Sequence, residues 1–121
     1  MDNVDTIKAR LVFQGANIPA TSDAERRLHE NGILCIPDFI ANAGGVIAAA
    51  VEYQRGSQRS AFHTIAAKIS ENTEEVLKSA RSNKTSPREA AEKMARIRLQ
   101  KAIEIRHLRA LMNSLSGNRP G

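Results

Sequence analysis

The sequence is poor in aromatic residues and cysteine, and each shortage excludes a class of structure or function. Aromatic residues make up 3% of the 121 residues and tryptophan is absent, so a hydrophobic core must consist of Ala, Ile, Leu and Val. Because these side chains bury less area, we expect marginal stability unless a partner covers part of the surface. The single cysteine, Cys35, excludes an intramolecular disulfide and a multi-cysteine zinc site, and it fits a reducing compartment.

Long apolar runs and a glycine-rich phosphate loop are also missing. The N-terminus lacks the apolar region of a signal peptide, and no run reaches the roughly 18 apolar residues of a membrane span. We therefore expect a soluble, cytoplasmic protein that does not bind membranes. The seven glycines never form the G-x-G-x-x-G spacing of a dinucleotide-binding fingerprint. The three histidines lie on different predicted helices without a second ligand at i+4, so we expect no metal site: His29, His63 and His107.

The charge is distributed unevenly along the chain. Residues 1–56 carry five basic and seven acidic groups, and residues 57–121 carry 13 basic and six acidic groups, for a total of +5. A basic half suggests nucleic acid or an acidic partner, and a non-catalytic helical module that binds one of them is the alternative function. However, the basic residues are interspersed with glutamates at helical spacing and lack an aromatic stacking platform. A solvated helical surface is therefore the better interpretation, and nucleic acid binding is unlikely to be the function.

The first part of the chain predicts a strand, a helix and a second strand. Short apolar runs at 11–13 and 33–36 are typical of buried strands. Between them, Ser22 and Glu25 have the spacing of a capping box, with Ser22 as the N-cap, and Gly32 ends a helix over 23–31. Such a unit of fewer than thirty residues predicts two parallel strands joined by a helix.

The second part of the chain predicts long helices. Asn42 can cap a helix whose apolar body, 46–51, is either buried or faces a ligand. A helix from Ser60 has an apolar stripe, and another, which begins with a capping box at Ser86, extends to about Leu115. We expect Met94 and Met112 to fill the core. The fold class is thus α/β and helix-rich: two short parallel strands followed by long α-helices, with a disordered tail at 116–121.

Two short segments place an asparagine after each predicted strand: 14–19 (QGANIP) and 37–46 (PDFIANAGGV). The carboxyl ends of parallel strands form the edge at which α/β folds bind ligands. An asparagine amide matches a primary carboxamide such as that of nicotinamide, and neighbouring glycines allow a close approach of the backbone. By spacing alone, however, a turn at Asn17 and a helix cap at Asn42 explain the same residues.

The two segments are followed by an apolar helix that ends in Glu52 and Tyr53. Together, and at this separation, these features resemble the glutamate/leucine/phenylalanine/valine dehydrogenase family, closest to its glutamate branch. The resemblance covers roughly residues 3–115. It implies that residues 1–56 are the end of a Rossmann-like nicotinamide-nucleotide-binding domain and that residues 57–115 are C-terminal helices. It also implies NAD or NADP as cofactor and a full-length enzyme that oxidatively deaminates an L-amino acid.

The resemblance also implies roles for individual residues. The cofactor would be bound by residues of both segments: Gly15, Ala16, Asn17 and Asn42. Val46 and Ala49 would face the substrate side chain, and Ala49 lacks the hydroxyl that is usual in glutamate-specific members, so the substrate stays open. The family's catalytic lysine and aspartate belong to an N-terminal domain that this chain lacks. We therefore expect a C-terminal fragment that is inactive by itself and that self-associates through its uncovered sheet.

Overall fold

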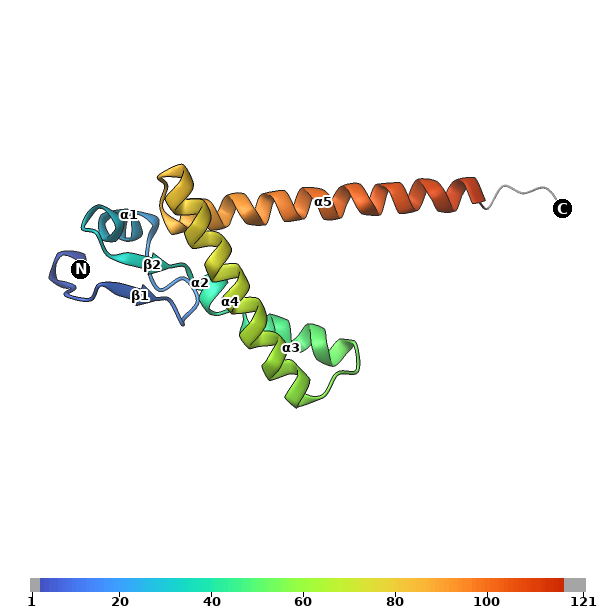
Figure 1. Cartoon of the computed structure of the whole chain (residues 1–121), viewed down its shortest axis with the longest axis horizontal. Coiled ribbons are helices and arrows are strands. Elements are labelled where there is room, and N and C mark those ends of the chain that lie inside the picture. The colour runs from blue at the N-terminus through green and yellow to red at the C-terminus, as the bar shows by residue number, and fades with distance from the viewer. Residues whose placement is uncertain (1–2, 117–121) are drawn as a thin grey trace. The chain divides into compact units, whose positions relative to one another are not determined.

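A computed structural model describes residues 3–116 and shows a helix-rich α/β fold with one small sheet (Figure 1). A short 3-10 helix, η1 (Val4–Thr6), precedes strand β1 (Leu11–Phe13), helix α1 (Ser22–Glu30) and strand β2 (Leu34–Ile36). The remaining elements are helical: α2 (Asp38–Ala41), α3 (Gly44–Tyr53), α4 (Gln58–Asn83) and α5 (Pro87–Ser116). Residues 117–121 of the predicted tail lie outside the described part of the chain.

Strands β1 and β2 form the predicted parallel pair, in which Val12 lies opposite Cys35. Helix α1 connects them, which confirms the predicted strand-helix-strand unit. The N-cap of α1 is Thr21 rather than the predicted Ser22: the Thr21 hydroxyl accepts a hydrogen bond from Ala24 N at 3.2 Å. At the other end of α1, Gly32 has a φ of 74°, as expected for a glycine that follows a helix.

The core lies between α1 and one face of the sheet. Val4, Leu28, Ile33 and Cys35 are buried there, and partly buried apolar residues pack around them: Ile7, Val12 and Ala24. Elsewhere in the chain, Ile36 and Val76 are fully buried. Burial of each side chain contributes about 1.5–3 kcal/mol to the free energy of unfolding. The core is therefore aliphatic, as the lack of aromatic residues predicts.

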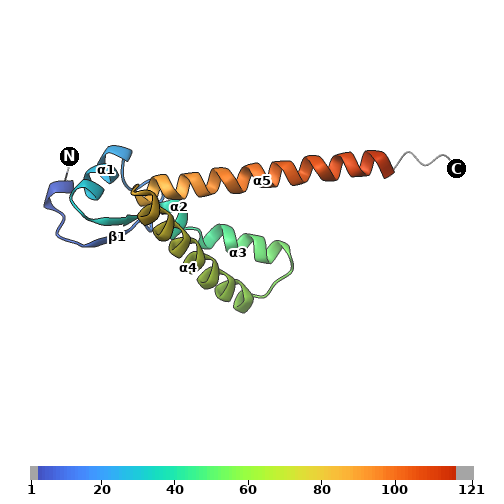
Figure 2. The same ribbon diagram turned by 45° about the horizontal axis from the view of Figure 1, so that its top comes forward.

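The segment that follows β2 differs from the prediction. A single turn of helix, α2, precedes α3, so Asn42 is the C-cap of α2, and the N-cap of α3 is Ala43. The prediction that Asn42 caps the apolar helix is thus wrong. Helix α3 packs along α4, and the two run side by side in Figures 1 and 2. No residue of α3 is fully buried, and Val46 is 78% exposed, so the expectation that this helix is buried is wrong. The expectation that it faces a ligand stays a prediction.

Helices α4 and α5 begin at side-chain caps. Ser57 caps α4 by accepting from Ser60 N, and α4 ends at Lys84, whose φ is 54°. The predicted capping box of α5 is confirmed in both directions: Glu89 N donates to the Ser86 hydroxyl at 3.2 Å, and Ser86 N donates to the Glu89 carboxylate at 3.0 Å. Of the predicted stripe on α4, Val76 and Ala80 are buried, whereas Phe62 is exposed.

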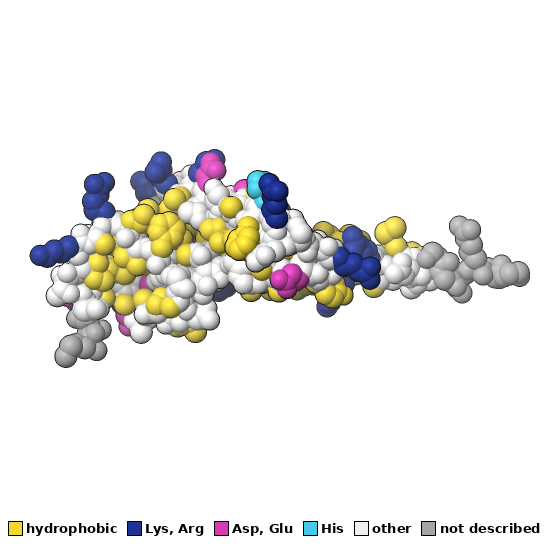
Figure 3. All heavy atoms as spheres, turned by 90° about the horizontal axis from the view of Figure 1, so that it is seen from below, with side chains coloured by type: hydrophobic (Ala, Val, Ile, Leu, Met, Phe, Trp, Pro, Cys, Tyr) yellow, Lys and Arg dark blue, Asp and Glu magenta, His cyan; other side chains and the backbone are white. Residues whose placement is uncertain are grey.

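Backbone contacts divide the chain after Ala91, within α5. The part of α5 beyond that point exposes several large apolar side chains beside Lys and Arg, and Figure 3 shows such side chains at the surface. Met112 is one of them, so the prediction that it fills the core is wrong. In the described part of the chain, none of the helices is both long and apolar enough to cross a membrane. The domain boundary predicted after residue 56 stays a prediction.

Candidate functional site

The two asparagines that follow the strands lie against each other. Asn17 lies in the loop after β1, and Asn42 ends the short helix after β2. The Asn42 Nδ2 amide donates a hydrogen bond to Asn17 Oδ1 at 2.6 Å, and both side chains are exposed. The parallel pairing therefore brings two residues that are 25 positions apart to one edge of the sheet, as the sequence predicts.

Open space adjoins this asparagine pair. A Cβ atom added at Gly15 or Gly45 would have no heavy-atom neighbour within 4 Å, and Gly15 and Ala16 are both exposed. A ligand can thus approach the backbone closely on the loop after β1 and at the start of α3. The paired amides keep further hydrogen-bonding capacity, because each amide has two donors and an acceptor and their mutual bond uses one donor.

The two residues expected to contact the substrate lie on α3. Val46 and Ala49 are both exposed, and their spacing of three places them on one face of the helix. Both side chains are apolar, so they can contact an aliphatic group but neither can donate a hydrogen bond. Their predicted role as substrate contacts stays a prediction.

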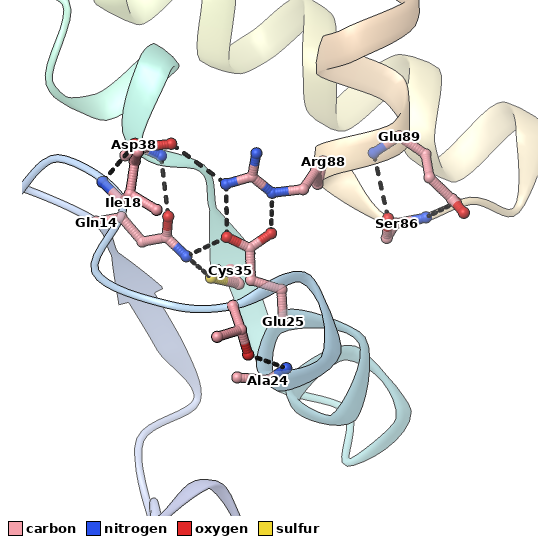
Figure 4. Close-up of polar contacts among 10 residues, drawn as sticks. Gln14, Ile18, Ala24, Glu25, Cys35, Asp38, Ser86, Arg88 and Glu89 are labelled. Carbon is pink, nitrogen blue, oxygen red and sulfur yellow. Dashed lines mark hydrogen bonds and ion pairs between the residues drawn. The ribbon is translucent and has the colours of Figure 1, made fainter. Parts of the chain in front are cut away.

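A polar network that includes buried side chains involves Gln14 and Ile18 of the loop between β1 and α1 (Figure 4). Gln14 is buried, and its Nε2 donates to Glu25 Oε1 at 2.7 Å and to Cys35 Sγ at 3.2 Å. The Gln14 Oε1 atom accepts from Asp38 N at 3.1 Å. One side chain thus joins the end of β1 to α1, β2 and α2.

Arg88, from the first turn of α5, completes the network. Its Nε donates to Glu25 Oε2, and its Nη2 donates to Glu25 Oε1 at 2.6 Å and to Asp38 Oδ1 at 3.2 Å. The guanidinium also lies over the ring of Phe39, 5.4 Å from its centroid, in a cation–π contact. Two carboxylates share one cation, and the Arg88–Glu25 bond is the bidentate kind that arginine forms best.

The network shifts the ionisation of three of its members. A hydrogen bond from Ile18 N, together with that from Phe39 N and the charge of Arg88, lowers the pKa of Asp38 below its ordinary value. Hydrogen bonds to Glu25 and Asp38 raise the pKa of Arg88. Burial raises the pKa of the Cys35 thiol, which disfavours the reactive thiolate and fits a structural thiol.

Sequence reasoning missed this network. Glu25 was interpreted only as part of a capping box, and Gln14 only as part of a turn. The available signals were an acidic residue after the proline that ends a buried strand, at Asp38, and an arginine directly after a helix-starting proline, at Arg88. In the described residues 3–116, no group of three His, Cys, Asp or Glu side chains could hold a metal ion.

Comparisons with known proteins give consistent matches. The family profile of glutamate/leucine/phenylalanine/valine dehydrogenases matches residues 1–106. The glutamate dehydrogenase of Aeropyrum pernix is 35% identical over 115 residues, which cover 87% of this chain and 28% of that protein. The NADP(+)-dependent glutamate dehydrogenase of Pyrobaculum calidifontis is 53% identical over 57 residues, 47% of this chain and 14% of that protein.

A solved structure has a similar fold. The L-tryptophan dehydrogenase of Nostoc punctiforme superimposes with a TM-score of 0.74 at 22% identity, over 84% of this chain and 31% of the other. The chain thus spans less than a third of the length of each of these proteins.

Proposed function

Because the chain belongs to the glutamate/leucine/phenylalanine/valine dehydrogenase family, we propose that it is the part of an NAD(P)-dependent amino-acid dehydrogenase that positions the nicotinamide and the substrate side chain. The observation that carries this proposal is the contact between Asn17 and Asn42 at the open edge of the sheet. Two amides at that edge provide the donors and the acceptor that a nicotinamide carboxamide needs.

The residues divide between cofactor and substrate. Gly15, Ala16, Asn17 and Asn42 bind the nicotinamide end of the cofactor, which when bound accepts a hydride. Val46 and Ala49 contact the substrate side chain. In the whole enzyme an L-amino acid is oxidised to a 2-oxo acid and ammonia, and the cofactor is reduced.

The proposal for the cofactor follows from the names of relatives, and the proposal for the substrate follows from Ala49. Relatives are named as NADP(+)-dependent, NADP-specific or NAD-specific glutamate dehydrogenases, so both cofactors occur in the family. We place the chain near the glutamate branch. Ala49 cannot donate a hydrogen bond to a side-chain carboxylate, which argues against a strict preference for glutamate.

The chain by itself is proposed to be inactive. None of its lysines is a candidate general base, since those of the described residues lie at the exposed surface and not in a pocket beside a substrate. Purified chain incubated with glutamate, leucine or phenylalanine and either cofactor should show no reduction of the nicotinamide at 340 nm. Measurable turnover would contradict this part of the proposal.

The binding role is tested in a chimaera that joins the upstream part of a relative to this chain. Asn42→Ala should raise KM for the cofactor and lower kcat, because it removes one amide from the nicotinamide site. Asn83→Ala is the matched control, since that amide bonds only within its own helix turn, to Ser79. Equal effects of the two substitutions would refute the assignment, and a salt-sensitive shift of duplex DNA by the chain would favour the basic helical module.

A further inference from the structure

The loop that carries Asn17 has a strained backbone. Ile18 has a φ of 48°, in the left-handed region, which a β-branched residue rarely adopts. Ile18 is also exposed, so its own side-chain packing does not hold it there. Such strain persists only where the surroundings fix the conformation, and it is concentrated at functional sites.

Asp38 is the group that holds this conformation. Its Oδ2 atom accepts a hydrogen bond from Ile18 N at 2.9 Å, while its Oδ1 atom accepts from Arg88 at 3.2 Å (Figure 4). The carboxylate is therefore fixed on one side by the arginine and fixes the loop backbone on the other. Hydrogen bonds to a charged acceptor are the stronger kind, which suits a carboxylate that must hold a strained residue.

Asp38 also sets the place of Asn42. It is the first residue of α2, and its carbonyl oxygen accepts the Asn42 backbone N–H at 2.7 Å. In addition, its own N–H donates to buried Gln14. One residue thus contacts the loop of Asn17 through its side chain and Asn42 through its backbone.

The geometry points to Asp38 as a positioning residue that holds the amides of Asn17 and Asn42 in register for the ligand, with Arg88 as its anchor. This inference deepens the proposed function and rests on it for the identity of the ligand. The contact between the two asparagines is a property of the chain alone, so the positioning role can be tested separately.

The test uses the full chain, labelled with nitrogen-15, and nicotinamide mononucleotide as the probe. Wild-type chain should show a slowly exchanging Ile18 amide, a nuclear Overhauser contact between the side chains of Asn17 and Asn42, and shifts of both side-chain signals with the probe. In Asp38→Ala, Ile18 exchange should be about tenfold faster or more, because a hydrogen bond to a charged group stabilises by at least that factor. The contact between the asparagines should weaken, and the probe concentration at half-saturation should rise.

Two further variants separate positioning from folding. Asp38→Glu keeps the charge beside Arg88 but displaces the oxygen from Ile18 N, so it should loosen the loop even if Asp38→Ala fails to fold. Asp38→Asn keeps an oxygen that can accept from Ile18 and should restore part of the contact. Asp23→Asn is the control, since that carboxylate is exposed and pairs with Arg26.

The outcomes distinguish the two proposals. Unchanged Ile18 exchange and an unchanged asparagine contact in Asp38→Glu, or equal changes in Asp23→Asn, would overturn the positioning role whatever the probe does. If the side-chain signals of Asn17 and Asn42 in the wild-type chain do not shift with nicotinamide mononucleotide, that result counts against the proposed function alone. In that case, loss of the asparagine contact in Asp38→Glu, with recovery in Asp38→Asn, still supports positioning.

Discussion

Glu25 is a buried carboxylate whose charge is balanced by one arginine. Its exposure is 7%, and the Arg88 side chain that pairs with it is 25% exposed. Taking both charges out of water costs free energy, which their mutual attraction and the bidentate hydrogen bond offset. The pair is therefore not a large net source of stability, but removing Arg88 leaves the buried Glu25 carboxylate without its cation.

Arg88→Met should destabilise the chain strongly. A buried ion pair that loses one partner costs about 3–5 kcal/mol of the free energy of unfolding, because the remaining charge has no counterpart. Urea unfolding followed by circular dichroism measures the change. Arg26→Met is the control, since that side chain is 66% exposed in its pair with Asp23 and should cost less than about 1 kcal/mol. Similar losses in the two variants would show that Glu25 is hydrated in solution.

Asp38 should make stability depend on pH in the acid range. Its pKa in the folded chain lies below the ordinary value of 3.8, so between the two values the unfolded chain binds more protons. The contribution of Asp38 is therefore fully present above about pH 4 and is lost as the pH falls through the folded pKa. Wild-type chain should lose more stability than Asp38→Asn on acidification from pH 5 to pH 2, as measured by urea unfolding. Parallel curves would contradict the prediction.

At the scale of single elements, the sequence predicts those helix ends that depend on contacts between residues close together in the chain. The capping box at Ser86 and the glycine after α1 depend on neighbours within a few residues, and both are confirmed. The turn of α2 was missed because four residues carry no helical periodicity, and its presence moved Asn42 from a cap of α3 to the end of α2. The apolar run of α3 did not reveal its exposure, because apolarity all round a helix does not say what covers it.

The candidate site was predictable only in part for the same reason. The pairing of Asn17 with Asn42 follows from two parallel strands that end at one edge, and that topology could be inferred from the sequence. The contact between Arg88 and Glu25 joins residues 63 positions apart, and no local pattern encodes such a separation. The contact of Asp38 with the backbone of Ile18, 20 positions away, likewise has no local pattern that predicts it.

The exposed face of α3 yields a prediction on specificity. In the chimaera with a relative's upstream part, Ala49→Ser should shift preference toward glutamate, because the hydroxyl adds a donor for the side-chain carboxylate. A hydrogen bond to a charged group stabilises by about 1.5–3 kcal/mol, which corresponds to roughly ten- to a hundredfold in relative kcat/KM. The measurement compares glutamate with leucine. An unchanged ratio would remove Ala49 from the substrate site.

At the scale of the whole molecule, part of the apolar surface of the sheet is exposed to solvent. In the described part of the chain it has two strands, and β1 exposes Leu11 and Phe13, the latter by 56%. Strand β1 also borders a groove of about 500 Å³ that Ile7, Val12 and Phe13 help to line. Exposed strand edges and apolar patches favour association.

The chain should therefore self-associate in solution. Light scattering at increasing concentration should report a mass that rises above that of one chain, and Phe13→Lys should reduce the rise by placing a charge on the strand. Phe62→Lys is the matched control, because Phe62 is also an exposed phenylalanine, at 65%, but lies on α4 outside the sheet. A monodisperse monomer with a high melting temperature would contradict the prediction.

The distance along the chain between Glu25 and Arg88 has a consequence for synthesis. Translation proceeds at about 5–20 residues per second, so residue 88 follows residue 25 after roughly 3–13 s. For that interval the nascent chain can form its strands and α1, yet Glu25 has no arginine and stays in water. The buried polar network is therefore completed late, when α5 begins to emerge, and a ribosome paused before Arg88 would hold a chain in which Glu25 and Asp38 still lack their shared cation.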